Sequence, residues 1–280
     1  MSNLINENLE TSGNLTSNSE LTANVKKWGR PQKISADLGF NSLTKVDHII
    51  YLTNRDSDGL FSFDLNSKPT DTIYLTAQGY GGVYSATGID EWAKPQKIEI
   101  TAGLRFSSII AIGHTAYLTS PSGGIYSFDL ITQALPHHIA LTETYGFLDL
   151  FAVGNTLYLT TKGPDGIFVF DIISQKEPSR MLNTEGLGFR SIAVKDNVAY
   201  LTTHSGDGIY TYNLSTKEKP QQVSGTSGFG FRDITIYNNT AYLTTQGSHG
   251  IFIFDLASRA KPQQLPNSDG LGFEGIIITN

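Results

Sequence analysis

The stretch that decides the fold is FRSIAVKDNVAYLTTHSGDGIYTYNLSTKEKPQQV, residues 189–223. Four short strands can be read from it. An apolar strand at 191–194 ends in an Asp-Asn turn, and a β-branched and aromatic strand follows at 198–203. After a Gly-rich turn, 209–214 alternates aliphatic and aromatic residues, and a proline opens a polar strand at 221–223. The stretch therefore predicts a small antiparallel sheet.

The same unit recurs along the chain. The tripeptide Tyr-Leu-Thr occurs six times, beginning at Tyr51, Tyr74, Tyr117, Tyr158, Tyr200 and Tyr242. The glycine that opens the alternating strand returns every 42 residues, at Gly82, Gly124, Gly166, Gly208 and Gly250. A phenylalanine after glycine precedes an aliphatic stretch at Phe40, Phe106, Phe147, Phe189, Phe231 and Phe273. Because repeats of this length indicate a repeat architecture, one structural unit should correspond to one copy.

Four antiparallel strands in about 42 residues is the size of a propeller blade. One such sheet cannot bury its own faces, so neighbouring sheets must supply the rest of the core. The first strand of each unit is the most apolar and the last the most polar, which suits a radial arrangement. We therefore predict an all-β fold, a β-propeller of four-stranded blades. Six blades fit the length best, with seven as the alternative.

One unit is irregular. Tyr51 and Tyr74 are only 23 residues apart, so the Gly-Phe segment and first strand of that unit are missing between them. The chain also ends in a first strand after Phe273, and it begins with an outer strand at Arg30-Pro31. We expect the two ends of the repeat region to share one blade and so to close the ring.

Composition limits the partners. Residues 1–25 are polar and contain no aromatic side chain, which predicts a disordered tail ahead of a propeller at 26–280. A net charge of −6 and a pI near 5.5 argue against nucleic-acid binding. No apolar run is long enough to span a membrane, and there is no cysteine. We expect a monomer, cytoplasmic or exported without a classical signal peptide, with no cofactor.

The repeat resembles the LVIVD repeat of bacterial and archaeal surface proteins. The matching residues are clearest in Asn155 to Pro178, Asn197 to Pro220 and Asn239 to Pro262. The family has a turn and strand of the form G-N-x-A-Y-V, a strand of the form G-L/I-x-x-x-D-V, and a proline near the outer strand. Here Tyr-Leu-Thr stands where the family has Tyr-Val-Ala. The resemblance implies a β-propeller over about residues 30–280 and supplies no catalytic residues.

The Gly-Phe position gives the candidate site, because it should surround one mouth of the central channel. The candidates are its aromatic residues and their charged neighbours: Arg105, Phe106, Phe147, Phe189, Arg190, Phe231, Arg232, Phe273 and Glu274. An alternative interpretation makes the phenylalanines core residues between blades. The charged neighbours are the stronger candidates for binding, because they change from copy to copy and packing does not require them.

Recurring carboxylates have a structural interpretation. Asp64, Asp129, Asp171 and Asp255, with Asn213, end the same strand in their units, which predicts Asx turns. No converging set of ligands for a metal ion is evident, and no catalytic residue is assigned.

Three functions stay open. The first is a non-enzymatic binding scaffold that recognises a protein or other macromolecule through its loops. The second is a carbohydrate-binding lectin, with sets such as Tyr200, Thr202 and Tyr210 repeated between blades. The third, a hydrolase or lyase, would use acidic groups at the channel mouth, namely Glu274 with Asp149 and Asp233.

Overall fold

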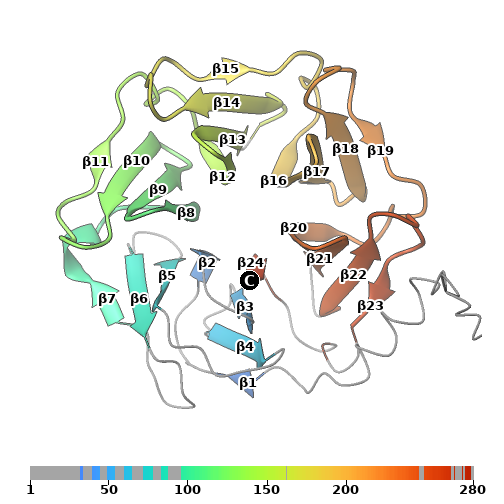
Figure 1. Ribbon diagram of the computed structural model, residues 1–280, viewed down its shortest axis with the longest axis horizontal. Coiled ribbons are helices and arrows are strands. Elements are labelled where there is room, and N and C mark those ends of the chain that lie inside the picture. Colours follow the sequence, from blue (N-terminus) through green and yellow to red (C-terminus); the bar gives the residue numbers. More distant parts are fainter. Residues whose placement is uncertain are drawn as a thin grey trace, which may run out of the picture.

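The structure is a computed structural model. It describes the strands between residues 32 and 87 and most of 96–278, with gaps at 162, 246–248, 266–267, 269–272 and 274. Side chains are described from Lys97 to Ile276 outside those gaps. The described strands form six four-stranded antiparallel sheets arranged in a ring (Figure 1). This confirms the predicted β-propeller with six blades; seven blades is wrong. The tail predicted at 1–25 lies outside the described residues.

Four blades follow the chain from the innermost strand to the outermost. Blade 3 contains β8 (Ser108–Ile112), β9 (Thr115–Ser120), β10 (Gly124–Asp129) and β11 (His137–His138). Blade 4 contains β12 (Phe147–Val153), β13 (Thr156–Thr161), β14 (Ile167–Asp171) and β15 (Ser179–Arg180). Blade 5 contains β16 (Phe189–Lys195), β17 (Val198–Thr203), β18 (Ile209–Asn213) and β19 (Gln221–Gln222). Blade 6 contains β20 (Phe231–Tyr237), β21 (Thr240–Thr245), β22 (Ile251–Asp255) and β23 (Gln263–Gln264).

The other two blades are built from crossed segments. Blade 1 has the order β1 (Gln32–Lys33), β4 (Leu60–Asp64), β3 (Ile49–Thr53), β24 (Gly275–Ile278). Blade 2 has the order β2 (Phe40–Thr44), β5 (Thr72–Ala77), β6 (Val83–Thr87), β7 (Gln96–Ile98), and a 3-10 turn, η1 (Glu99–Thr101), follows β7. The C-terminal strand β24 pairs with β3 as the innermost strand of blade 1, beside the centre of the ring (Figure 1). The expectation that both ends of the repeat region share one blade is therefore confirmed.

The segment missing between Tyr51 and Tyr74 is supplied from earlier in the chain. Only seven residues join β4 to β5, whereas 26 residues join the corresponding strands β14 and β17. Seven residues are too few to form an outer strand, cross the blade and form an inner strand. Instead β1 pairs with β4 and β2 pairs with β5. Both positions are therefore filled, and the prediction that this unit lacks its first strand is corrected.

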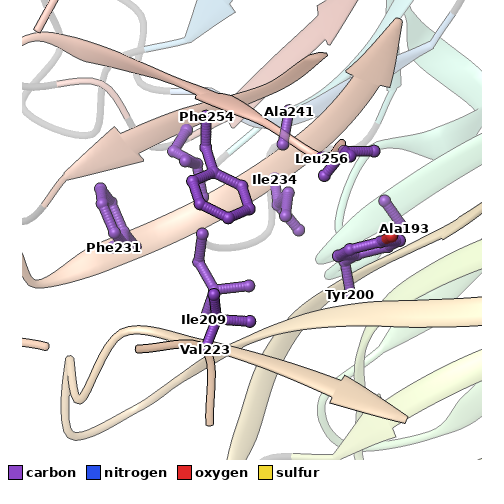
Figure 2. Close-up of a cluster of buried hydrophobic side chains, with 10 residues drawn as sticks. Ala193, Tyr200, Ile209, Val223, Phe231, Ile234, Ala241, Phe254 and Leu256 are labelled. Carbon is purple, nitrogen blue, oxygen red and sulfur yellow. The ribbon is translucent and has the colours of Figure 1, made fainter. Parts of the chain in front are cut away.

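The hydrophobic core lies between neighbouring blades. One cluster joins Ile209 and Val223 of blade 5 to Phe231, Ile234 and Phe254 of blade 6 (Figure 2). Equivalent clusters join blade 2 to blade 3, blade 3 to blade 4, and blade 4 to blade 5. Each blade thus buries apolar side chains that it could not bury alone, and this stabilises the ring rather than the separate sheets.

The repeated aspartates form the predicted turns. Oδ1 of Asp171 accepts hydrogen bonds from the backbone N–H groups of Ile173 (3.1 Å) and Ser174 (2.6 Å) after β14. The equivalent side chains in blades 3, 5 and 6, Asp129, Asn213 and Asp255, each accept two bonds in the same way. These hydrogen bonds lower the pKa of Asp129 and Asp171. Asp64 belongs to β4, where side chains are not described.

Candidate functional site

Each inner strand begins with a β-bulge at the mouth of the ring. The pairing of β16 with β17 shifts register between Phe189 and Ile192, and β20 shifts in the same way between Phe231 and Ile234. A bulge removes backbone groups from the ladder, and they need other partners. The N–H of Ser191 donates to Oγ1 of Thr202 (3.2 Å) in its own blade. The bulge therefore depends on a side chain of the Tyr-Leu-Thr repeat.

The same threonines link one blade to the next. Thr202 Oγ1 donates to the carbonyl of Arg232 in blade 6 (2.7 Å), and Thr160 Oγ1 donates to the carbonyl of Arg190 in blade 5 (3.0 Å). Both threonines are fully buried. Each therefore fixes the backbone of the arginine that follows the phenylalanine in the next blade.

Removing one of these hydroxyls should weaken the ring. We expect Thr202→Val, which keeps the side-chain shape, to lower the free energy of unfolding by about 2 kcal/mol, because a buried N–H and a buried carbonyl lose their partner. Urea denaturation measures this. Thr211→Val on the half-buried face of β18 is the control; equal stability of the two variants would contradict the linking role.

A belt of serine and aspartate side chains lies one residue further along the inner strands. Ser108 Oγ donates to Asp149 Oδ1 (2.7 Å), and the N–H of Ile192 donates to Asp149 Oδ2 (2.9 Å). Ser191 Oγ donates to Asp233 Oδ1 (2.5 Å), and the N–H of Ile276 donates to Asp233 Oδ2 (2.7 Å). Each carboxyl group thus bridges the preceding blade and the following blade. Asp233 also holds the closing strand β24.

Both carboxyl groups are poorly solvated, although each residue keeps some accessible surface. Burial raises the pKa of Asp149 and is also the main cause that raises the pKa of Asp233 to about 7, with the negative charge of Asp149 as the second cause. Because all four carboxyl oxygens accept hydrogen bonds from the protein, the role that the geometry assigns to this pair is to join blades.

The phenylalanines of the candidate site belong to the core. Phe106, Phe147, Phe189, Phe231 and Phe273 are each exposed by 1% or less. Phe147 and Phe231 pack against Phe168 and Phe252 of their own blades, and Phe189 lies near Tyr210. A ligand at the mouth cannot reach rings buried to this extent, so the binding role predicted for these five residues is corrected to the alternative, packing between blades.

The charged candidates remain at the mouth. Arg190 and Arg232 occupy equivalent positions in β16 and β20 and are partly exposed, and Arg105 is exposed just before β8. Glu274 lies outside the described residues. The structure therefore brings Arg190 and Arg232 to neighbouring blades.

A histidine accompanies the two arginines, and sequence reasoning treated it as an ordinary turn residue. His204 follows β17, and its N–H donates to the carbonyl of Gly188 (2.9 Å), just before β16. Partial burial lowers the pKa of His204, and the positive charges of Arg190 and Arg232 lower it further. The three side chains therefore lie close enough to interact electrostatically. We call Arg190, His204 and Arg232 the basic cluster.

The residue set named for a lectin is not accessible. Thr202 and Thr244 are fully buried, and Tyr200 and Tyr242 are exposed by 8% and 7%. The threonine hydroxyls serve the bulges of blades 5 and 6. These residues repeat because each blade needs the same links, so the prediction that they form glycan pockets is corrected.

Sequence reasoning also missed a buried hydroxyl five residues before each phenylalanine. Thr142, Thr184, Thr226 and Ser268 are fully buried, and each accepts a hydrogen bond from the N–H that follows the repeated glycine. The recurrence at nearly constant spacing was visible in the sequence, and it could have identified this position.

Comparisons with known proteins support the fold and no closer relation. No model of a known protein family matches the chain, and no curated protein is similar in sequence. A β-propeller chain in the crystal structure of a nidogen/laminin complex superposes with a TM-score of 0.60 at 14% identity, over 83% of this chain and 97% of that chain. The computationally designed Ika4 protein gives 0.41 at 13% identity, over 54% and 91%. At this identity the first match shows the fold alone.

Two further properties concern only the described residues. Within them, no group of three or more histidine and acidic side chains is placed to hold a metal ion. No helix there is long and apolar enough to cross a membrane.

Proposed function

We propose that the chain is a non-enzymatic binding propeller that recognises another protein through the mouth at which the inner strands begin. One contrast carries the proposal. The residues that repeat from blade to blade are buried and hold the ring together. The residue after each core phenylalanine instead changes: Ser107, Leu148, Arg190 and Arg232 in blades 3 to 6. Variable exposed positions on a rigid frame are where a scaffold carries its specificity.

Two comparisons bear on this proposal. The nidogen/laminin complex is an example of a chain with this fold in a protein complex, which supports the proposal by analogy. The assignment of the repeat to the LVIVD type is also proposed, on the match between Asn155 and Pro262. Recognition of a protein is favoured over glycan binding because the repeated polar set named for glycans is buried.

A capture experiment tests the proposal. The full chain, immobilised and exposed to lysate of its source cells, is compared with the variant Arg190→Glu/Arg232→Glu by quantitative mass spectrometry. We expect at least one protein to be enriched by the wild type and lost with the variant, because reversing two charges at an interface penalises the native partner.

The control variant has the same change in net charge at the rim of the ring. Arg180→Glu/Lys219→Glu alters two exposed residues, one on the outer strand β15 and one just before β19. It should retain the partner. If the mouth variant and the rim variant enrich the same proteins as the wild type, recognition through the mouth is wrong.

A further inference from the structure

The basic cluster is the one place where the described residues gather positive charge against the overall balance of the chain. The protein carries a net charge of −6. Yet the charges that shift the pKa of His204 among the described residues, those of Arg190 and Arg232, are both positive. Asp207 lies in the same turn as His204, where its backbone N–H donates to Thr203 Oγ1 (3.1 Å), and Asp165 lies in the corresponding turn of blade 4, near Thr161 Oγ1 (3.3 Å). Neither carboxylate is among the charges that act on His204.

The backbone beneath the cluster is held in place. The carbonyls of Arg190 and Arg232 are fixed by Thr160 and Thr202 from the preceding blades. The His204 ring packs near Gly188, where an added Cβ would lie 3.3 Å from its Cδ2 atom. Fixed donors lose little entropy when they bind an anion, so a site of this kind gains affinity from preorganisation.

Apolar surface adjoins the positive charge. Leu187 and Phe229 lie two residues before the core phenylalanines of blades 5 and 6, and both are partly exposed. Phe229 stacks on Phe231 with ring centroids 5.2 Å apart. Lys261 Nζ lies 5.6 Å from the centroid of the Phe229 ring, which adds a further cation on the outer side. The surface therefore suits a ligand with both negative and apolar groups.

We propose that the basic cluster binds the carboxylate side chains of an acidic peptide segment in the partner protein, with apolar neighbours of those carboxylates packing on Leu187 and Phe229. This inference rests on the proposed function. Guanidinium groups match carboxylates in a bidentate geometry, and the ring between them adds a third nitrogen donor. A peptide is favoured over a polyphosphate chain because the apolar flank has no use in phosphate binding.

The test uses the full chain and a defined probe. Fluorescein-labelled Glu-Leu-Glu-Glu-Leu-Glu is titrated by fluorescence anisotropy, beside a matched peptide with Gln in place of Glu. We expect the acidic peptide to bind, its affinity to fall with salt, and Arg190→Gln/Arg232→Gln to weaken binding at least about tenfold. Arg190→Lys/Arg232→Lys should keep the charge and lose part of the affinity, because Lys cannot form the bidentate pair. The rim variant Arg180→Gln/Lys219→Gln should bind like the wild type.

The imidazole of His204 provides a second readout that folding effects do not imitate. Saturation with the acidic peptide should raise the pKa of His204 from its lowered position, because a carboxylate beside the ring stabilises the imidazolium. The chain has only six histidines, so NMR titration with His204→Gln as the assignment control resolves this signal.

Three outcomes overturn the inference. They are equal binding of the acidic and Gln peptides, an unchanged pKa of His204 at saturation, and displacement of the acidic peptide by equimolar inorganic phosphate, which would make the site one for small anions. If a cellular partner still depends on Arg190 and Arg232 while the peptide does not bind, the peptide inference fails and the proposed function stands. If the peptide binds and no partner depends on the arginines, the proposed function fails.

Discussion

Replacing Gly208 by alanine is expected to destabilise the protein more than any other single methyl group added to blade 5. Gly208 has φ of +109°, and an added Cβ would lie 2.6 Å from both the carbonyl oxygen and Oγ1 of Thr226. Thr226 is fully buried, accepts a hydrogen bond from the N–H of Ile209 (2.9 Å) and donates one to the carbonyl of Val223 (2.7 Å). The methyl group would therefore displace a hub of buried hydrogen bonds.

The expected loss is about 3 kcal/mol or more in the free energy of unfolding, measured by urea denaturation. It combines overpacking of the core with the left-handed backbone that alanine tolerates poorly. Gly225→Ala separates the two causes, because Gly225 has φ of +77° and an added Cβ would meet nothing within 4 Å. That control should lose only about 1 kcal/mol. Equal losses in the two variants would show that the close approach to Thr226 does not exist.

Asp233→Asn is expected to stabilise the protein at pH 8 by about 2–4 kcal/mol and to change its stability little at pH 5. The native state holds a proton on Asp233 up to about pH 7, whereas an aspartate in the unfolded chain loses it near its ordinary value of 3.8. Between these pH values the native state binds more protons than the unfolded state. Its stability therefore falls as the pH rises, and levels off above about pH 7.

Asparagine removes this dependence because it stays neutral. It can still accept from the N–H of Ile276, and the Ser191 hydroxyl can rotate to accept from its amide. Losing the charge at position 233 also removes the repulsion between this group and Asp149. Urea denaturation of the wild type and the variant at pH 5, 6, 7 and 8 gives the two profiles. The control is Asp207→Asn, at an exposed turn residue. A wild-type stability that rises from pH 5 to pH 8 would contradict the account of Asp233.

The sequence predicts most of the architecture because one repeat specifies one blade. The spacing of Gly166 and Gly208 sets the blade length, and the apolar pattern sets the strands. Val198–Thr203, for example, is observed with the bounds that were predicted. The Asx turn at Asp171 could also be predicted, since it depends only on the next three residues.

Features that depend on contact between blades were harder to predict. Asp149 and Asp233 look like isolated acidic residues in the sequence, and their partners lie 41 to 43 residues away. Placing the position two residues after each phenylalanine in register gives Ser108, Asp149, Ser191 and Asp233, and this alternation was the available signal. The burial of Phe231 follows from the curvature of the ring, which brings blade 5 onto blade 6 and which no local pattern specifies.

The crossed path of the first strands is the other feature that local reasoning could not give. The 23-residue interval between Tyr51 and Tyr74 showed that a segment was missing, and the segment before Tyr51 has the composition to fill it. Pairing of β2 with β5 is non-local, so only the assembled ring shows where that segment goes.

The central claim is that the chain closes into a ring through β24 and β3. Because the protein has no cysteine, the double variant Leu52→Cys/Ile276→Cys contains the only two thiols, at positions that pair directly across these strands. The account predicts an intramolecular disulfide between residues 52 and 276 after mild oxidation, detected by peptide mapping of the monomer. Leu52→Cys/Ile236→Cys, with the second thiol in the neighbouring blade, should give none. Free thiols or only intermolecular disulfides in the first variant would contradict the closed ring.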